Sequence, residues 1–359
     1  MAEPAIRFDK TCIVFGSAAD EALRLADGGA DRATIQQQTG AVLGVHDASL
    51  DVNEGEIVVL MGLSGSGKST LLRGVNRLNP VVRGTVTIRD KDWSSEVSRC
   101  NAADLLRIRR QCVGMVFQQF ALLPWRTVNE NVGFGLEIAG MAEAPRAAKV
   151  KEQLALVGLS DWANRKVGEL SGGMQQRVGL ARAFATGAPI LLMDEPFSAL
   201  DPLIRTRLQD ELLGLQARLQ KTILFVSHDL DEALKIGNRI AIMEGGRVVQ
   251  FGTPRDIVFA PANDYVARFV AHINPLTVLR AADIAVPPET LDKAVKLAAT
   301  ARPDMPISAI ITALGKRDGA IGLMEGGRIT GAITAGDVMR AISRFQARAH
   351  SAKPSDPAP

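Results

Sequence analysis

The chain has 359 residues, enough for a full-sized domain and a smaller second one. Hydrophobic residues make up 47% and charged residues 23%, which excludes a wholly disordered, collagen-like or disulfide-stapled protein. The 42 Lys and Arg residues against 39 Asp and Glu leave a net charge of +3 without a basic stripe, which argues against nucleic acid as the main ligand or partner.

The cysteines and the hydropathy of the sequence limit where the protein can work. Cys12, Cys100 and Cys112 are scattered without metal-binding spacing, which is typical of reduced thiols in a cytosolic protein. The first residues lack the basic and then apolar segments of a secretory signal, so we expect none. No run approaches the roughly 18 uncharged apolar residues of a membrane span, so work at a membrane would require docking onto other helices.

The first eighty residues alternate between strand patterns and other elements. Residues 5–15 predict a short strand, and residues 16–40, rich in Ala, Asp and Gln with helical spacing, indicate an insertion. A second strand pair is predicted around residues 46–50 and 56–61. The last of these strands ends in glycines, and residues 69–78 then have helical composition. The order is therefore strand, glycine loop, helix.

The middle of the chain is helical and then alternates again. Residues 103–185 are mostly helical by pattern, which predicts a helical subdomain. A strand follows at 190–193, then a helix with Asp201 as N-cap and Pro202 at its first position, and then a strand at 222–226. Strands that alternate with helices predict a parallel α/β sheet.

The last third of the chain contains two similar turns and a change of composition. Residues 240–252 and 323–333 each predict a hairpin around Glu-Gly-Gly-Arg, which we interpret as one turn chemistry used twice. Asn274-Pro275 is a candidate linker. We therefore predict a small second domain over about 275–346 and a disordered tail, rich in Pro, Ser and Ala, over 347–359.

Residues 62–69, Gly-Leu-Ser-Gly-Ser-Gly-Lys-Ser, fit the pattern G-x-x-x-x-G-K-[ST] between a hydrophobic strand and a helix, the context of a phosphate-binding loop. Glycines let backbone N–H groups surround phosphates, and the helix N-terminus adds its positive dipole end. A glycine-rich turn without function is the weaker alternative. We predict an ATP and Mg²⁺ site with Lys68 on the β/γ-phosphates and Ser69 on the metal. The predicted nucleotide-binding residues of this loop are Gly62, Leu63, Ser64, Gly65, Ser66, Gly67, Lys68, Ser69 and Thr70.

Two carboxylates, Asp194 and Glu195, end the apolar run 190–193. Asp194 is placed to hold Mg²⁺ through water, and Glu195 is placed to orient the attacking water. Taken alone, a buried strand that ends in a solvated acidic turn is the simpler interpretation. Together with the glycine loop in the same chain, the pair favours nucleotide hydrolysis.

A second nest of small residues, Ser171, Gly172 and Gly173, follows Leu170 and precedes a helix. Such a turn suits an anion, or it is a plain helix N-cap. At this point the sequence resembles the ATP-binding cassette (ABC) family, whose signature LSGGQ is matched here as LSGGM. The fifth position departs from the family pattern, but it is peripheral to the phosphate contact.

The resemblance assigns roles to four further residues. Gln118 matches the Q-loop glutamine that touches Mg²⁺ and the attacking water. His228 matches the switch histidine that contacts the γ-phosphate, and Asp201 matches the D-loop residue that crosses to the partner subunit. Phe15 matches the aromatic residue that stacks on adenine. The motifs occur in the family order over about residues 5–255, which implies Glu195, His228 and Gln118 as catalytic and Ser69, Gln118 and Asp194 as metal ligands.

The resemblance also implies a fold and an assembly. The expected fold is α/β, a P-loop NTPase ABC cassette over residues 1–274 with a parallel core sheet, an antiparallel β subdomain and a helical subdomain. Two copies would form a head-to-tail dimer with two ATP molecules held between Lys68 of one subunit and Ser171 of the other. An ATP hydrolase of this kind is coupled to transmembrane transport, so the resemblance implies a peripheral position on the cytoplasmic face of the inner (plasma) membrane.

Several stretches favour one branch of the family. The absence of fused membrane spans favours a separate importer subunit, which implies an integral permease and, indirectly, a substrate-binding protein as partners. Residues 39–50, 201–206 and 261–266 resemble the importers of glycine betaine, proline betaine and choline. Gln119 and the Leu-Pro-Trp-Arg stretch at 123–126 look most like the choline-importer ATPases.

The second domain resembles a known regulatory unit only at its end. Residues 331–340 are similar to the strand-to-helix close of a cystathionine-β-synthase (CBS) motif, so this domain is expected to be small and α+β. Osmoregulatory relatives carry two such motifs as a sensor of ionic strength or nucleotide, whereas the length here allows little more than one. A sensing role is therefore a hypothesis beside a structural cap or a dimerisation surface.

Three other functions are alternatives to a subunit of a quaternary-amine importer. The alternatives are an importer ATPase for another small solute, and a soluble ABC ATPase acting on DNA repair or ribosomes, which usually has paired cassettes, coiled-coil inserts or basic linkers. A sensor that does not hydrolyse ATP is disfavoured because Glu195 and His228 are both present. Aromatic residues make up only 4%, so no cage for a quaternary ammonium group is indicated in this chain.

Overall fold

The computed structural model divides the chain into two compact units, one formed by residues 1–232 and 236–251, the other by residues 233–235 and 252–359. We call them the first and the second unit. The structure describes residues 3–118, 121–198, 200–271, 273–274, 276, 278–290, 295–316 and 318–351, and the side chains of these except 344–351. Gln119 and Pro275, of the predicted choline-importer stretch and the candidate linker, lie outside the described residues.

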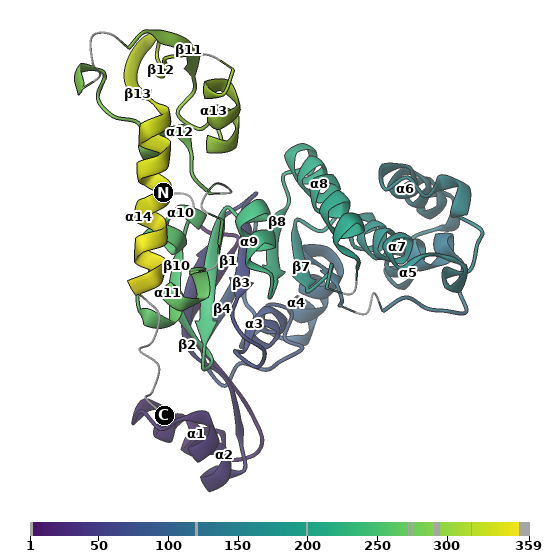
Figure 1. Ribbon diagram of the computed structural model, residues 1–359. Helices are drawn as coiled ribbons and strands as arrows, with labels where there is room; N and C mark the ends of the chain where they lie inside the picture. Colours follow the sequence, from purple (N-terminus) through teal and green to yellow (C-terminus); the bar gives the residue numbers. More distant parts are fainter. Residues whose placement is uncertain are drawn as a thin grey trace. The chain divides into compact units, whose positions relative to one another are not determined.

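A six-stranded sheet, in the order β10-β9-β3-β8-β7-β6, is the centre of the first unit (Figure 1). β3 pairs in parallel with β8 and β9, and β7 pairs in parallel with β6 and β8. β3, β7 and β8 are buried along their whole length, which explains their continuous apolar sequences. The predicted parallel α/β sheet is confirmed. Its strands are β3 (Ile57–Met61), β6 (Val113–Val116), β7 (Ile190–Asp194), β8 (Thr222–Val226), β9 (Arg239–Glu244) and β10 (Arg247–Gly252).

A second sheet, in the order β2-β1-β4-β5, is antiparallel. It consists of β1 (Ile6–Phe15), β2 (Val42–Val52), β4 (Arg83–Asp90) and β5 (Trp93–Glu96). The strand predicted at 5–15 is confirmed, but the predicted pairing of 46–50 with 56–61 is wrong. β2 pairs with β1, whereas β3 is buried on both faces and lies between β8 and β9 in the other sheet.

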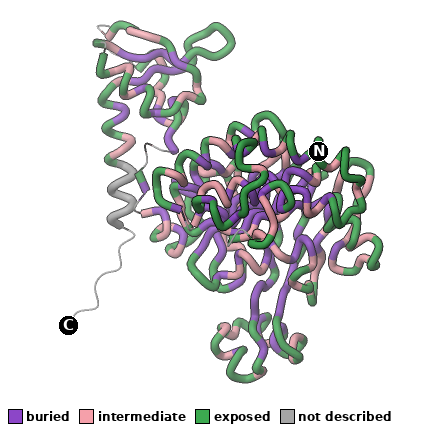
Figure 2. Tube along the Cα trace, turned by 90° about the vertical axis from the view of Figure 1, so that its right-hand side faces the viewer, coloured by how far each residue is buried: buried purple, intermediate pink, exposed green. Residues whose placement is uncertain are grey.

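The insertion predicted at 16–40 forms two helices, α1 (Ala19–Asp27) and α2 (Arg32–Thr39), at the ends of β1 and β2 (Figures 1 and 2). The Asp31 carboxylate caps α2 by accepting a hydrogen bond from the Thr34 N–H at 2.7 Å. The two helices share a small core of their own with the strands that carry them. Its buried members include Leu23, Ile35, Cys12, Val14 and Leu43.

Three helices form the helical subdomain around a separate core that includes Val132, Leu154 and Val178. They are α5 (Val128–Ile138), α6 (Glu143–Leu156) and α7 (Gly172–Ala185). This subdomain begins later than the predicted residue 103. A short helix, α4 (Ala102–Arg107), is followed by β6, which pairs with β7 in the parallel sheet. Four residues are too few for the sequence pattern to distinguish this strand from its helical surroundings.

Two helices of the first unit follow strands of the parallel sheet. α3 (Lys68–Gly74) follows β3, and α8 (Pro202–Leu219) connects β7 to β8. The predicted start of α8 is confirmed, because the Asp201 Oδ1 accepts a hydrogen bond from the Ile204 N–H at 3.0 Å and Pro202 lies in the first turn. The chain continues after β8 into α9 (Leu230–Ile236).

The second unit contains a sheet in the order β11-β12-β13, parallel between the first two strands and antiparallel between the last two. Ile310, Ile321 and Ile333 belong to its core. This arrangement confirms a small α+β domain. Its elements are α10 (Pro254–Phe259), α11 (Asp264–Val270), α12 (Ala281–Ile284), β11 (Leu297–Ala301), α13 (Ile307–Leu314), β12 (Ala320–Glu325), β13 (Arg328–Ile333) and α14 (Ala335–Ser351).

The limits of this unit differ from the predicted ones. Apart from residues 233–235, it begins at Gly252 instead of residue 275, because Phe259 packs against its core and α11 contacts α14. α14 continues to Ser351, so residues 347–351 of the predicted tail are helical. The remainder of that tail, 352–359, lies outside the described residues.

The two Glu-Gly-Gly-Arg turns have the same backbone conformation. Gly245 and Gly246 have φ angles of 57° and 88°, and Gly326 and Gly327 have φ angles of 58° and 79°. Two successive positive φ angles are typical of a tight hairpin turn that glycine adopts without strain. The prediction of one turn chemistry used twice is confirmed.

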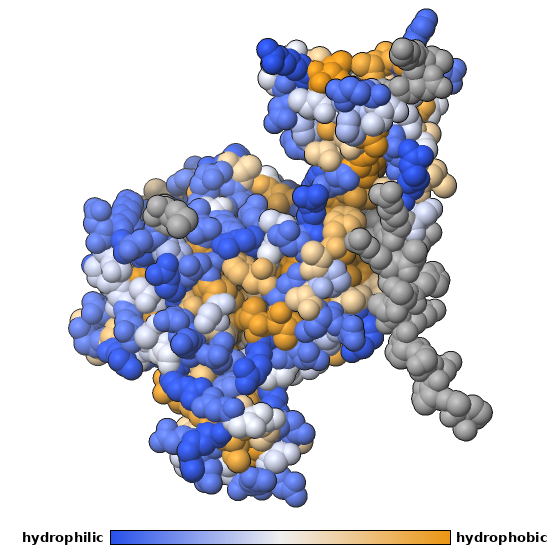
Figure 3. All heavy atoms as spheres, turned by 90° about the vertical axis from the view of Figure 1, so that its left-hand side faces the viewer, coloured by the Kyte–Doolittle hydropathy of each residue, from blue (hydrophilic) through white to orange (hydrophobic). Residues whose placement is uncertain are grey.

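The surface mixes hydrophilic side chains with scattered apolar ones (Figure 3). Of the helices that the structure describes, none is long and apolar enough to cross a membrane. The first unit nevertheless exposes large apolar side chains at two places. Trp125, before α5, is 68% exposed, and Leu203, in the first turn of α8, is 80% exposed. These side chains are available for contacts with other proteins.

Candidate active site

A cavity of about 460 Å³ lies where β3 turns through the glycine loop into α3. Parallel strands end at the same edge of a sheet, so the loops after β3, β7 and β8 meet here. The structure therefore brings together residues that the sequence predicted separately. The cavity is lined by Phe15, Arg32, Val42, Leu43, Gly44, Ser64, Gly65, Gly67, Lys68, Ser69, Thr70, Glu195 and His228.

Close backbone approach requires glycine at two positions of the loop. Gly62 and Gly67 have φ angles of 143° and 101°, in a region that other residues rarely adopt. A Cβ atom at Gly62 would lie 2.2 Å from the Met243 carbonyl oxygen, and one at Gly67 would lie 2.5 Å from the Gly44 carbonyl oxygen. The loop is thus held tightly against the neighbouring strands.

Not every predicted loop residue faces the cavity. Gly62, Leu63 and Ser66 are absent from its wall. The Leu63 side chain is exposed elsewhere, and the Ser66 hydroxyl is buried without a hydrogen-bond partner among the described residues. These three residues contribute to the loop through their backbone. Ser64, Ser69 and Thr70, in contrast, line the cavity.

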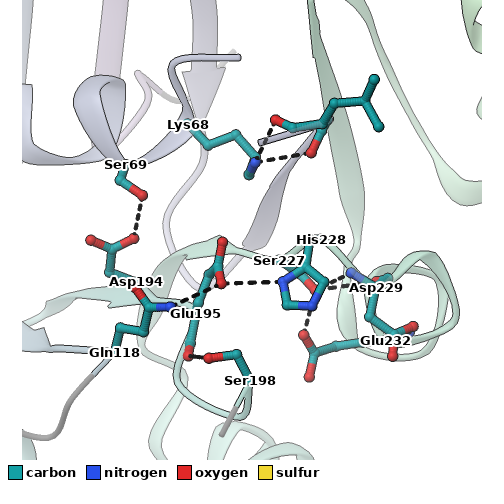
Figure 4. A network of polar contacts seen from close by, with 12 residues as sticks. Lys68, Ser69, Gln118, Asp194, Glu195, Ser198, Ser227, His228, Asp229 and Glu232 are labelled. Carbon is teal, nitrogen blue, oxygen red and sulfur yellow. Dashed lines mark hydrogen bonds and ion pairs between the residues drawn. The ribbon is translucent and has the colours of Figure 1, made fainter. Parts of the chain in front are cut away.

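Lys68 is a buried cation in the first turn of α3. Its Nζ donates hydrogen bonds to the carbonyl oxygens of Gly62 at 2.9 Å and Leu63 at 3.0 Å (Figure 4). Burial lowers the pKa of Lys68, and the nearby carboxylates of Glu195 and Asp194 act in the opposite direction. Within the described part of the chain Lys68 forms no ion pair, so its charge is met by carbonyl dipoles and is available to an anion.

Asp194, at the end of β7, is only 1% exposed. It accepts hydrogen bonds from the Ser69 Oγ at 2.6 Å and the Arg73 Nη2 at 2.9 Å (Figure 4 shows the first). Ser69 and Arg73 are four residues apart on α3 and therefore lie on the same face of the helix. Arg73 was not predicted as a site residue, and this spacing was the signal that could have found it.

Three oxygen-bearing side chains fit a magnesium ion: Ser69 contacts Asp194, and Gln118 contacts the neighbouring Glu195. Ser69, Asp194 and Gln118 offer hydroxyl, carboxylate and amide oxygens, the hard ligands that Mg²⁺ prefers. No group of three His, Cys, Asp or Glu side chains that could hold a metal ion occurs among the residues described.

Glu195 is held by residues from two neighbouring loops. Its Oε2 accepts a hydrogen bond from the Gln118 Nε2 at 3.3 Å and lies 3.1 Å from the His228 Nδ1 (Figure 4). Gln118 follows β6, and His228 follows β8. The φ angle of Glu195 is 45°, a conformation that costs about 1–3 kcal/mol for a residue other than glycine and concentrates at functional sites. The carboxylate is thus pinned at the cavity.

The second group of predicted residues lies away from this cavity. The Ser171 hydroxyl caps α7, and Gly172 and Gly173 form its first turn. A Cβ atom at Gly173 would lie 2.9 Å from a methyl group of Ile204, so this turn packs on the start of α8, which Asp201 caps. None of the four predicted residues lines the cavity. Within one copy of the chain the predicted site residues therefore form two separate groups, one at the cavity and one at the starts of α7 and α8.

A buried carboxylate, Glu232, lies behind His228. It accepts hydrogen bonds from the Ser227 hydroxyl and from the Gln209 Nε2, the latter at 3.0 Å (Figure 4 shows Ser227 and Glu232). Burial raises the pKa of Glu232 above its ordinary value, and the two hydrogen bonds only partly oppose this. Ionisation of Glu232 therefore lowers the stability of the folded state.

The variant Glu232→Gln is expected to flatten the pH dependence of stability. A raised pKa means that the folded state binds this proton more tightly than the unfolded chain. The free energy of unfolding therefore falls as pH rises from the ordinary pKa of glutamate through the raised one. Urea unfolding between pH 4.5 and 8 measures this, with the exposed Glu152→Gln as control. Parallel stability curves for wild type and Glu232→Gln would contradict the expectation.

Comparison with known proteins places these features in one family. The profile of the ABC transporter family matches residues 45–198. The chain is 52% identical over 272 residues to the glycine betaine/proline betaine transport system ATP-binding protein ProV of Salmonella typhimurium, covering 76% of this chain and 67% of that protein. It is 47% identical over 290 residues to the trimethylamine N-oxide transport system ATP-binding protein TmoW of Pelagibacter ubique, covering 81% and 84%.

A solved structure agrees with the fold. The dimeric structure of a bacterial ABC transporter cassette matches this chain with a TM-score of 0.58 at 31% identity, over 70% of this chain and 99% of that one. A structure of the post-hydrolysis state of a dimeric cassette, bound to ADP and phosphate, matches with a TM-score of 0.57. Both matches cover the length of a complete cassette.

The parallel sheet, the glycine loop and the carboxylates at the sheet edge define a P-loop ATPase of the ATP-binding cassette class. The chain belongs to the ABC transporter family, in the group of the ATP-binding proteins just described. The predicted family, fold class and ATP binding are confirmed. The roles of the individual site residues stay predictions.

Proposed function

We propose that this chain is the ATP-hydrolysing subunit of an importer for a quaternary-amine osmolyte. Lys68 and Glu195 line one cavity, and Asp194 accepts a hydrogen bond from Ser69 of the cavity wall, which supports hydrolysis of a nucleoside triphosphate. The solute class is supported by the relatives, which are named for the transport of glycine betaine, proline betaine and trimethylamine N-oxide. Choline, favoured by the stretch at 123–126, is the narrower proposal within this class.

The cavity offers each part of ATP a matching surface. Backbone N–H groups of the loop 62–70 and the Lys68 ammonium bind the phosphates. Phe15 lines the same cavity, where its ring would lie 3.0 Å from a Cβ atom at Gly44, and it supplies a face for adenine. When Mg²⁺ is bound it offsets phosphate charge, and Ser69, Gln118 and Asp194 are the residues that would hold it.

Hydrolysis requires a positioned water and a place for its proton. Glu195 accepts a hydrogen bond from the water, orients it toward the terminal phosphorus and receives its proton as the new phosphorus–oxygen bond forms. The bond from that phosphorus to the bridging oxygen breaks, which leaves ADP and phosphate. Gln118 and His228 keep the Glu195 carboxylate in place through the contacts at 3.3 and 3.1 Å.

A second copy of the chain completes the site. Ser171, Gly172 and Gly173 lie outside the cavity of their own chain and would face the phosphates bound by Lys68 of the other copy. Asp201 and the exposed Leu203 would lie near the same junction. The other proposed partners are an integral permease, contacted on the cytoplasmic face of the membrane, and a separate substrate-binding protein that the chain does not touch.

The second unit is proposed as a CBS-like regulatory domain or a structural cap. The resembling stretch, 331–340, is the end of β13 and the start of α14. Thr334 and Asp337 form the turn between them, with hydrogen bonds from the Thr334 N–H to the Asp337 Oδ2 at 2.8 Å and from the Asp337 N–H to the Thr334 Oγ1 at 3.3 Å. These bonds define the helix start and are compatible with either role.

Uptake of labelled solute tests the proposed function. Cells whose only copy of this subunit is wild type are expected to take up choline or glycine betaine, in competition with each other, and cells with Glu195→Gln are expected to lose this uptake. Loss of betaine uptake alone would shift the solute within the class. Wild-type cells that import neither compound, although the purified subunit hydrolyses ATP, would contradict the proposed solute class and leave the ATPase intact.

A further inference from the structure

One side chain of the insertion reaches the nucleotide cavity. Arg32, the first residue of α2, donates hydrogen bonds from Nη1 to the Gly65 carbonyl oxygen and from Nη2 to the Gly44 carbonyl oxygen. It forms part of the cavity wall together with Lys68. A Cβ atom at Gly246 would lie 2.5 Å from Nη2, so the turn between β9 and β10 lies directly against the guanidinium group.

The insertion that carries Arg32 is anchored to the sheet. Arg83 of β4 donates two hydrogen bonds to the Asp27 carboxylate at the end of α1, at 2.7 and 2.8 Å. The buried His46 of β2 lies 2.8 Å from the same carboxylate through Nε2. Asp31 then fixes the start of α2. These contacts hold Arg32 at the glycine loop independently of any ligand.

The surroundings of Arg32 leave its charge without an anion. Arg73 and Arg83 are paired with Asp194 and Asp27, but within the described residues Arg32 forms no ion pair. Its Nε is buried without a hydrogen-bond partner in the same part of the chain. Burial also lowers the pKa of Arg32. Like Lys68, Arg32 is a partly desolvated cation whose hydrogen bonds within the described residues go to carbonyl oxygens.

We propose that Arg32 is a phosphate-binding residue that the insertion contributes to the nucleotide site. It adds a second positive charge to the wall of the cavity beside Lys68 and covers two carbonyl oxygens that would otherwise leave negative dipole ends there. The insertion at 16–40 is therefore part of the ATP site. This inference rests on the nucleotide site proposed above and does not depend on the transported solute.

Calorimetric titration of the full chain with ATP, ADP and adenosine tests this role. The Arg32→Ala variant is expected to bind ATP and ADP about tenfold to a hundredfold more weakly, the range for loss of a charge-assisted contact. Adenosine, which has no phosphate, should bind as to wild type, and Arg32→Lys should restore part of the lost affinity. The matched control is Arg24→Ala, which removes an exposed arginine of α1.

Two results would overturn the inference. One is an affinity of Arg32→Ala for ATP and ADP equal to that of Arg24→Ala. The other is an equal loss for adenosine and ADP, which would mean that Arg32 only supports the loop. If Arg32→Ala does not fold, Arg32→Gln, which keeps hydrogen-bond donors and removes the charge, decides in the same way. An ATP affinity of Lys68→Ala equal to that of wild type would instead contradict the proposal that ATP binds at this cavity.

Discussion

Glu195→Gln is expected to lower the rate of ATP hydrolysis by about a hundredfold to ten-thousandfold, the contribution of a positioned general base. Glutamine has the same shape and keeps a hydrogen bond with Gln118 or His228, but it cannot accept the proton of the attacking water. ATP affinity should stay within about threefold of wild type, because the loop and Lys68 are unchanged. Phosphate release and equilibrium ATP binding measure the two effects separately.

The same variant is expected to accumulate the ATP-bound dimer. If hydrolysis separates two subunits that share their nucleotides, a subunit that binds ATP without cleaving it should remain paired. Size-exclusion chromatography with Mg²⁺ and ATP should then show a dimer for Glu195→Gln and a mixture for wild type. The exposed Glu152→Gln serves as control. Hydrolysis by Glu195→Gln within tenfold of wild type, or only monomer in the presence of ATP, would contradict the proposed roles.

Lys68→Ala is expected to lose ATP binding by about a hundredfold or more, because it removes a buried cation and the charge-assisted contacts with the phosphates that we propose for it. Thermal unfolding with and without ATP gives a direct measurement, since a ligand that binds only the folded state raises its stability. Millimolar ATP should raise the melting temperature of wild type and leave that of Lys68→Ala nearly unchanged.

The chain offers a matched control for this variant. Lys221 also donates to a backbone carbonyl oxygen, that of Gly187 at 3.0 Å, and burial also lowers its pKa, but it does not line the nucleotide cavity. Lys221→Ala should therefore keep the shift of the melting temperature with ATP. An equal shift in Lys68→Ala would show that this lysine does not bind the phosphates.

Local sequence was sufficient wherever neighbouring residues determine the conformation. The glycine loop follows from Gly62 and Gly67, because only glycine permits the backbone to approach so closely at these φ angles. The start of α8 follows from Asp201 and Pro202, and the two hairpin turns follow from paired glycines. The alternation of strands with helices predicted the parallel sheet, whose strands β3, β7 and β8 are buried along their whole length.

Contacts between distant residues were beyond the reach of the sequence. β2 and β3 are adjacent in the chain yet lie in different sheets, because hydrogen bonding to β1 and to β8 decides their places. β6 carried no clear pattern and was assigned to the helical subdomain. The limits of the second unit depended on the packing of Phe259 against a core formed much later in the chain.

The sequence by itself determined that this protein binds and hydrolyses a nucleotide, since each motif acts through a short stretch of backbone with its own geometry. Only the tertiary structure decided which charges meet in the cavity and beside it. Arg73 contacts Asp194 across 121 residues, and Arg32 reaches the glycine loop across 33. The physical reason is that the partner of a charged side chain depends on how strands and helices pack. The residues next to an arginine in the sequence do not indicate which distant group it will contact.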